Sequence, residues 1–367
     1  MKLMFVLNMI SILFLLLSYL ASYISPAGSF WWLQLIALGY GFLLLLNLSF
    51  VLFWIIAGRY IFWYSAIVII LGYSKIFGIV EPRMASGSEP VKAVDAVFPF
   101  KVMSFNVRLF DLYNWFHSNE TRGKIFSFLK NESPDIVCFQ EYYTSDRKQA
   151  EFNNDRVVPQ VLNMPYSHIE YTVTLRDSDH WGIAIFSKQP IINRQAVHFE
   201  KRGGNIFIYA DIKMNEDTFR VFNTHLESIR FRNEDYRYLE NLKKDVEQDE
   251  VAGGIKILAR LKRAFARRAR QVDMLKKEID ASPYPVIVCG DFNDTPSSYT
   301  YHKIADGLKD SFRESGSGFG KTYAGLFPSF RIDFILHSEK LFSSHYQTHR
   351  EKISDHFPIT CWFGLKK

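Results

Sequence analysis

Charged residues are almost missing from the first 80 positions of this chain. Only Lys2, Arg59 and Lys75 carry charge there, and the first acidic residue is Glu81. From that point on, charged and polar residues alternate with short apolar runs, which is the pattern of a soluble domain with a buried core. The chain therefore divides into an apolar N-terminal part and a longer soluble part.

Cysteine is scarce as well. The three cysteines, Cys138, Cys289 and Cys361, each lie inside a strand-like apolar run, and no two of them are closely spaced. An odd number without short spacing argues against both a disulfide framework and a zinc site. We interpret all three as buried thiols that pack as small apolar side chains.

Positive charge exceeds negative charge over the 367 residues, and the formal net charge is +6 at pH 7. This balance suits a polyanionic or phosphorylated substrate, or an anionic lipid surface, and does not choose between them. The length allows one sizeable domain with an anchor, or two modest domains.

Three apolar runs, residues 3–24, 31–57 and 60–80, make up the N-terminal part. Each is long enough to cross a bilayer as a helix, which takes about 20 apolar residues, and aromatic residues lie near the run edges, as at membrane interfaces. We therefore predict a transmembrane anchor of about three helices over residues 1–80. The alternative for the first run is a cleaved secretory signal, although no clear small-residue cleavage site precedes Tyr23.

The positive charges near these runs indicate an orientation. With three spans, Lys2 and Arg59 share one side of the membrane, which the positive-inside rule makes the cytoplasmic side. The C-terminal domain would then be extracytoplasmic, and cleavage of the first run would leave it on that same side. Lys75, Arg83 and Lys92 oppose this bias, because they flank the last run on the other side.

The soluble part begins with a segment rich in Pro, Ser, Gly and charge, residues 81–99, which we interpret as a linker. In residues 100–367 strand-like runs alternate with helical ones such as 121–130, and this predicts an α/β domain of layered sheets covered by helices. One charged stretch, 228–280, is far longer than a crossover needs. Its basic helical half is either a solvated helix face or a surface for phosphate or anionic lipid headgroups, and the sequence leaves both open.

Polar side chains stand at the ends of many of the strand-like runs. They are Asn106, Glu141, His225, Asp291, Asn293, Asp333, Asp355 and His356. Active sites of α/β folds gather where buried strands end. Carboxylates such as Glu141 and Asp355 are ligands that Mg²⁺ prefers, and a histidine against a carboxylate provides a base or an electrostatic partner. Taken singly, each residue is better explained as a turn former or a satisfied core residue.

The set becomes specific when its order along the chain is considered. The series SFNVR, CFQE, GIAIFSKQPI, NTHLE, GDFNDTP, RIDFIL and SDHFPI resembles the endonuclease/exonuclease/phosphatase superfamily, the group of deoxyribonuclease I and exonuclease III. The resemblance covers the soluble part of the chain. It implies a four-layer α/β sandwich, in which two β-sheets pack face to face between helices, and it implies Mg²⁺ as the cofactor, with Mn²⁺ as a substitute.

The resemblance also implies roles for the matching positions. The metal ligands would be Asn106, Glu141 and Asp355, and the contacts to the substrate phosphate would be Asn106, Arg108 and Asn293. The catalytic residues would be His225, Asp291, Asn293, Asp333 and His356. Among them, Asp291 would orient or deprotonate the attacking water, and Asp333 would polarise His356.

Two departures from one subfamily bear on the substrate. Inositol polyphosphate 5-phosphatases of this superfamily carry a tryptophan where this chain has Val288, and an arginine shortly after the asparagine, where this chain has the run DTP. That subfamily is therefore disfavoured, and RIDFIL looks closer to the nuclease and sphingomyelinase-like branches.

We therefore expect a membrane-anchored, Mg²⁺-dependent hydrolase of phosphodiesters or phosphomonoesters. Nucleic acid and phospholipid-type substrates stay equally open, and no protein partner is predicted. The alternative is a catalytically inactive, membrane-tethered module that uses the same fold for binding. Such a module has no need to keep Glu141, Asp291, Asn293 and His356 together.

Overall fold

The structure is a computed structural model of the whole chain, and it describes all residues except 84–95, 148–150, 201–202, 230–248, 326–329 and 367. The described chain forms two compact units. The first comprises Met1–Tyr73, Glu227–Asp273 and Ser297–Lys303, and the second comprises Ser74–Leu226, Met274–Pro296 and Ile304–Lys367. Most of the range interpreted as a linker, 81–99, lies outside the described residues.

The first unit contains the apolar N-terminal helices. They are α1 (Lys2–Ala21), α2 (Leu33–Leu38), α3 (Tyr40–Ile56) and α4 (Phe62–Leu71), and the short α5 (Tyr73–Ile76) follows at the boundary of the unit. Among the described residues only α1 is long and apolar enough to cross a membrane, while α3 and α4 are shorter apolar helices. The prediction of three transmembrane helices is therefore wrong, because α3 and α4 are shorter than a membrane-spanning helix requires.

Breaks at glycine explain the shortening of the second and third runs. Gly39 separates α2 from α3, and Gly72 ends α4. A Cβ on Gly72 would lie 2.2 Å from the ring of Tyr19, so the close packing of α1 against this turn requires glycine there. Glycine is costly inside a helix, and hydropathy alone does not register that cost.

A polar cluster connects α1, α3 and α4. Asn8 Nδ2 donates to Ser65 Oγ at 2.6 Å and Asn8 Oδ1 accepts from Trp54 Nε1 at 2.9 Å, while Asn47 Nδ2 donates to Ser11 Oγ at 2.8 Å. All five side chains are buried. Hydrogen bonds of this kind join helices in an apolar environment, because an unpaired polar group would be costly there.

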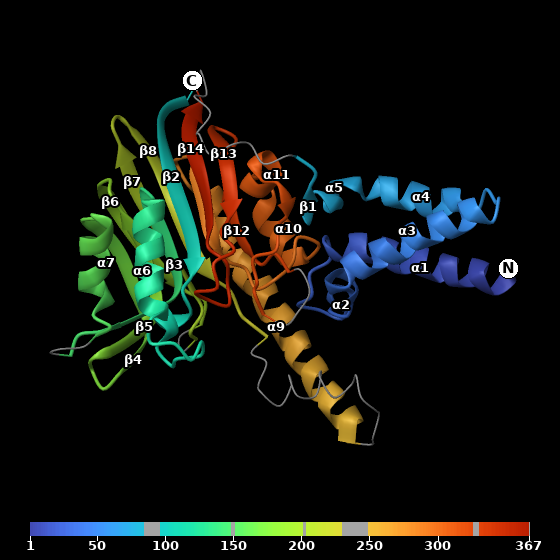
Figure 1. Cartoon of the computed structure of the whole chain (residues 1–367), viewed down its shortest axis with the longest axis horizontal. Coiled ribbons are helices and arrows are strands. Elements are labelled where there is room, and N and C mark those ends of the chain that lie inside the picture. The colour runs from blue at the N-terminus through green and yellow to red at the C-terminus, as the bar shows by residue number, and fades with distance from the viewer. Residues whose placement is uncertain (84–95, 148–150, 201–202, 230–248, 326–329, 367) are drawn as a thin grey trace. The chain divides into compact units, whose positions relative to one another are not determined.

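The second unit is built around two six-stranded sheets (Figure 1). The first has the order β13 (Leu341–Thr348), β14 (Ile359–Lys366), β2 (Ala96–Asn106), β3 (Ile136–Ser145), β5 (Asp179–Ser187) and β4 (Tyr166–Leu175). The second has the order β10 (Lys309–Asp310), β12 (Asp333–His337), β9 (Val286–Asp291), β8 (Asp217–His225), β7 (Ile206–Met214) and β6 (Ile191–His198). A two-stranded pair joins β1 (Val80–Glu81) and β11 (Gly318–Phe319).

The main core lies between the two sheets. It joins Val102 and Cys138 of the first sheet to Val221 and Cys289 of the second, all fully buried. The cysteines are free and buried, as predicted. A second cluster packs α6 (Thr121–Glu132) and α7 (Asn154–Leu162) against the outer face of the first sheet (Figure 1). The two packed sheets flanked by helices confirm the predicted α/β sandwich.

Each sheet has one parallel pair near its centre. β2 pairs in parallel with β3, and β8 pairs in parallel with β9. The chain between β2 and β3 contains α6, and the chain between β8 and β9 contains α9 (Asp249–Asp280), as parallel crossovers require. The carboxyl ends of both strands of each pair therefore share one edge of their sheet, and this is where the candidate site residues lie.

Candidate active site

The predicted residues at the strand ends come together. Asn106 ends β2, and its Nδ2 lies 3.1 Å from Asp291 Oδ2 at the end of β9 and 3.4 Å from Glu141 Oε1 on β3. His225 ends β8, and its Nε2 lies 3.7 Å from Asp291 Oδ2 and 3.8 Å from Glu141 Oε1. Four strands, two from each sheet, thus converge on one cluster of polar atoms.

A bulge directs Glu141 into this cluster. The pairing of β3 with β5 shifts register between Phe139 and Tyr142, and Glu141 has a φ of 49°. A β-bulge re-aims a side chain that regular alternation would bury. The side chain of Glu141 is 35% exposed, whereas Gln140 and Tyr142 beside it are buried. Burial in the site and the nearby carboxylate of Asp355 raise the pKa of Glu141.

Close pairing of β8 and β9 brings Asp291 to the edge. A Cβ on Gly290 would lie 2.2 Å from the carbonyl oxygen of Thr224, so the strand before Asp291 requires glycine. Asp291 is 1% exposed, and its Oδ1 accepts a hydrogen bond from the backbone N–H of Asn293 at 2.9 Å. Burial raises the pKa of Asp291 to about 6, although the nearby imidazole of His356 opposes the shift.

His356 and Asp333 form a buried pair. The Nδ1 of His356 lies 2.9 Å from Asp333 Oδ2, and its Nε2 lies 3.7 Å from Asp291 Oδ2. Asp333 begins β12 directly opposite Asp291 of β9, which explains why both carboxylates reach one imidazole. Burial alone would lower the pKa of His356, but the carboxylates of Asp333 and Asp291 outweigh it and raise this pKa well above the ordinary value. The two carboxylates therefore favour the cationic form of the imidazole.

Arg108 lies on a left-handed turn that directly follows β2. Four consecutive residues, 108–111, have positive φ, and Arg108 N–H donates to Asn106 Oδ1 at 3.1 Å. The guanidinium lies 4.4 Å from the ring centre of Trp115, and Arg108 Nε lies 3.4 Å from Asp355 Oδ2. The positively charged guanidinium of Arg108 thus lies next to Asp355, a predicted metal ligand.

Asn293 is oriented by the backbone. Its Nδ2 donates to the carbonyl oxygen of Leu226 at 3.0 Å, and its φ of 53° is left-handed. The amide oxygen is the atom that this contact leaves for other interactions. The predicted contact of Asn293 to a phosphate stays a prediction.

Two adjoining sets of side chains have the donors that a metal needs. Ligand atoms of Asp291, Asp333 and His356 all lie within 4.8 Å of one another. The predicted set is Asn106, Glu141 and Asp355, and the nearby Asp355 carboxylate contributes to the raised pKa of Glu141. In the first set the His356–Asp333 hydrogen bond already uses one imidazole nitrogen. The second set offers oxygen donors alone, which a hard divalent cation prefers.

Several residues that support the site were not singled out in the sequence. Gln140 Nε2 donates to Asn223 Oδ1 at 2.7 Å, which joins the two sheets just below the cluster. Ser354 Oγ donates to the carbonyl oxygen of Asn106 at 2.7 Å, and the ring of Tyr323 lies edge-on to His356 with centroids 5.3 Å apart. Gln140, Asn223 and Ser354 lie within or next to motifs that the sequence offered, whereas Tyr323 gave no signal.

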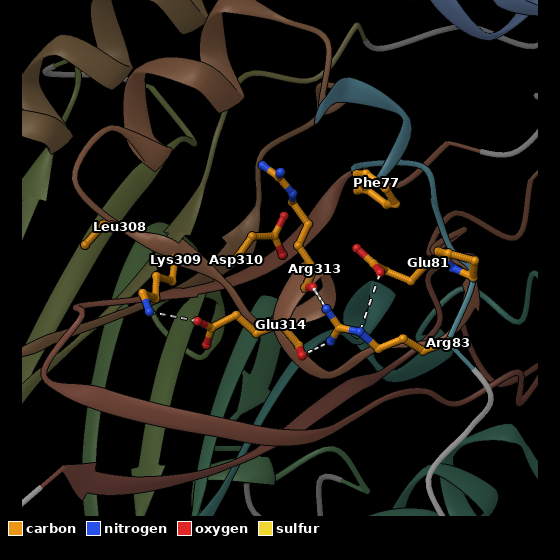
Figure 2. A pocket seen from close by; sticks show the side chains of 9 residues that line it. Phe77, Glu81, Arg83, Leu308, Lys309, Asp310, Arg313 and Glu314 are labelled. Carbon is orange, nitrogen blue, oxygen red and sulfur yellow. Dashed lines mark hydrogen bonds and ion pairs between the residues drawn. The ribbon is translucent and has the colours of Figure 1, made fainter. Parts of the chain in front are cut away.

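A pocket of about 510 Å³ lies elsewhere in the second unit (Figure 2). Its lining residues come from segments 77–83 and 308–314 and include none of the predicted site residues. Arg83 is one of the lining residues, and it donates to the carbonyl oxygens of Arg313, at 2.9 Å, and Glu314. Lys309 pairs with Glu314 at 3.1 Å. The contacts of Arg83 connect the segment after β1 to α11 (Ser311–Ser315), and the Lys309–Glu314 pair connects β10 to α11.

Two family models match parts of this chain. The model of the Endonuclease/Exonuclease/phosphatase family matches residues 103–356, and that of a domain of unknown function matches residues 1–78. No curated protein matches significantly.

Solved structures share the fold. An endonuclease/exonuclease/phosphatase from Beutenbergia cavernae has a TM-score of 0.54 and 15% identity, over 73% of this chain and 72% of that one. One from Bacteroides vulgatus has 0.53 and 17%, over 74% and 100%. The human nocturnin catalytic domain, with bound sulfate, has 0.51 and 18%, over 74% and 96%.

Proposed function

The chain belongs to the endonuclease/exonuclease/phosphatase family, and from that premise we propose that it is a membrane-anchored phosphoesterase that depends on a divalent metal. The observation that carries the proposal is the continuous run of contacts from Glu141 through Asn106 and Asp291 to His356 and Asp333. These contacts support a carboxylate site for a cation next to the carboxylate of Asp291 and the imidazole of His356. An inactive binding module would not need both.

The cation site is proposed to be Glu141, Asn106 and Asp355, with Mg²⁺ as the metal and Mn²⁺ as a substitute. In support of this, the carboxylate of Glu141 is costly to ionise in the protein alone, because partial desolvation and the nearby carboxylate of Asp355 raise its pKa. A bound divalent cation would remove that cost and would offset charge on phosphoryl oxygens.

The proton chemistry is proposed for Asp291 and His356. With a pKa of about 6, Asp291 is ionised at neutral pH and can accept a proton from an attacking water. His356 remains cationic, so it can hold a phosphoryl oxygen and stabilise the negative charge that develops there. Asp333 keeps the imidazole in its orientation.

Three further residues are proposed to contact the substrate. Arg108 and Asn293 would hold the phosphate, and His225, 3.7 Å from Asp291, would contact it or protonate the leaving oxygen. Nucleic acid and phospholipid-type esters both meet these requirements, because the residues recognise the phosphate rather than the group attached to it.

The membrane location is proposed from α1, which has the length and apolarity of a span, although a signal sequence passes the same test. The polar cluster around Asn8 and Asn47 supports packing of α3 and α4 against α1 in an apolar environment. Because Lys2 is the first residue of α1, the positive-inside rule favours an extracytoplasmic catalytic unit.

The test uses the full-length protein in detergent with Mg²⁺. Duplex DNA, sphingomyelin and a phosphoinositide are assayed side by side, with EDTA and a His356→Ala variant as controls. Metal-dependent cleavage that the variant lowers by about two orders of magnitude or more supports the proposal. Metal-independent turnover, or turnover equal in the variant, would refute it. The absence of any turnover together with the absence of a Mg²⁺-induced thermal shift would favour the inactive module.

A further inference from the structure

The part of α9 that belongs to the first unit carries a row of cations. Lys256, Arg263 and Arg270 are all exposed and lie seven residues apart. Seven residues are close to two full turns, so the three side chains emerge from nearly the same side of the helix, within about 20° per step. With a rise of about 1.5 Å per residue, the row is roughly 21 Å long. We call these three residues the basic stripe.

The opposite side of the helix is fixed in the protein. Leu261, Phe265, Ala269 and Val272 are buried along it. The basic stripe therefore faces outward, because the helix cannot roll without exposing this apolar side. Among the described residues, no acidic side chain pairs with a cation of the stripe, whereas Arg267 of the same helix pairs with Glu227 at 3.0 Å.

Two aliphatic side chains are exposed on the flank of α9 that lies between the basic stripe and the buried side. Ile255 is 62% and Leu258 is 41% exposed on the same stretch of α9. Lys262, which is also exposed, has its Nζ 5.3 Å from the ring centre of Trp31, in the segment between α1 and α2. Exposed cations beside exposed aliphatic side chains are typical of a helix that lies in a membrane interface.

We propose that the basic stripe binds anionic phospholipid headgroups, and that Ile255 and Leu258 enter the interface from the adjoining flank of the helix. The proposal rests on the proposed membrane anchoring, because α1 and this part of α9 belong to one compact unit. The sequence leaves open whether the basic helical half of residues 228–280 is a solvated helix face or a surface for phosphate or lipid headgroups, and the proposal assigns this surface to lipid headgroups.

Three observations favour lipid over nucleic acid as the partner. The stripe lies in the unit that contains α1 and not in the unit that contains Asp291 and His356. A nucleic-acid surface has no use for exposed Ile255 and Leu258, whereas binding to an interface buries them. The contact of Lys262 with Trp31 connects the helix to the end of an apolar segment, where tryptophan marks the headgroup level.

A fluorescent label on α9 tests the proposal directly in the full-length protein. Ala259 is exposed between the cations of the stripe, and the native cysteines are buried, so Ala259→Cys provides a selective labelling position. The labelled protein is reconstituted in nanodiscs of phosphatidylcholine, with or without phosphatidylglycerol, that contain a lipid with a nitroxide on its headgroup. Quenching of the label reports contact between α9 and headgroups.

Strong quenching is expected only in the discs with phosphatidylglycerol, and it should weaken as salt is raised. Three cations near an anionic surface together strengthen the attraction by about two orders of magnitude. The variant Lys256→Gln/Arg263→Gln/Arg270→Gln should therefore lose most of the quenching. A matched control, Lys130→Gln/Lys213→Gln/Lys340→Gln, removes the same charge from exposed positions of the second unit and should retain it.

Equal quenching in both kinds of disc, or no loss in the stripe variant, would overturn the proposal. Stripe-dependent binding of duplex DNA by the protein in uncharged detergent, without quenching in discs, would assign the stripe to nucleic acid instead. Failure of the catalytic proposal can be told apart from failure of this one, because His356→Ala should abolish turnover and leave the quenching intact. Failure to enter nanodiscs would refute the anchoring and this proposal with it.

Discussion

Replacing Asp333 by Asn tests the proposed roles of His356 and Asp291 most sharply. The side chain keeps its shape but loses the negative charge that lies 2.9 Å from His356 Nδ1. In the wild type, activity requires ionised Asp291, with a pKa of about 6, and cationic His356, whose pKa is well above the ordinary value. The pH–rate profile should therefore rise around pH 6 and stay high through neutral pH. A bound cation would move the acid limb lower.

In the variant, one of the two carboxylates that hold the imidazole cationic is gone. Its pKa should fall toward the ordinary value of about 6.5, so the basic limb of the profile should move down into the neutral range. The poorer orientation of the imidazole should lower the rate by a further factor of about 10² to 10⁴. The activity ratio of wild type to variant should therefore be larger at pH 8 than at pH 6.5.

The assay is kcat/KM against pH for a soluble phosphodiester, with saturating Mg²⁺. A matched control is Asp211→Asn, which breaks another buried ion pair, with Arg220 at 2.6 Å, outside the site. The control should lose stability and keep the shape of the pH profile. A variant profile parallel to the wild-type profile at every pH would refute the assignment of His356 as the cationic partner of Asp333.

Three other substitutions have defined outcomes. Asp291→Asn should lower the rate by a factor of about 10² or more. The folded-state pKa of Asp291 is raised, so its contribution to the free energy of unfolding is complete below the unfolded pKa of 3.8 and is lost as pH rises through about 6. Thermal unfolding should therefore show the Asp291→Asn variant to be more stable than the wild type above pH 6, by up to about 3 kcal/mol. Gly290→Ala should cost about 3 kcal/mol or more in denaturant unfolding, since its Cβ meets the Thr224 carbonyl, and an unchanged midpoint would contradict that contact. Glu141→Gln should abolish the thermal shift that Mg²⁺ produces in the wild type, and an intact shift would move the metal to Asp291, Asp333 and His356.

The central strands and their polar ends could be predicted from sequence because both signals are local. An apolar run such as the one before Asp291 gives a buried strand, and parallel pairing then places its end beside that of His225. The bulge at Glu141 and the left-handed turn at Arg108 depend on tertiary contacts, so the residues could be predicted from sequence but their orientation could not.

The apolar helices were overestimated for a different reason. Hydropathy counts side chains, but the breaks at Gly39 and Gly72 depend on packing, as the contact of Gly72 with Tyr19 shows. Strands β4 and β13 are hard to predict from sequence, because many of their residues are polar and only partly buried. Their pairing partners β5 and β14, which are more apolar, carried the recognisable pattern.

The proposal that water attacks a phosphoester at this site is tested most directly by isotope transfer. The full-length protein is given a phosphodiester and Mg²⁺ in ¹⁸O-labelled water, and the products are analysed by mass spectrometry. Incorporation of label into the phosphate product, abolished by EDTA and by His356→Ala, is the predicted result. Unlabelled phosphate product, or cleavage that persists in both controls, would contradict the account.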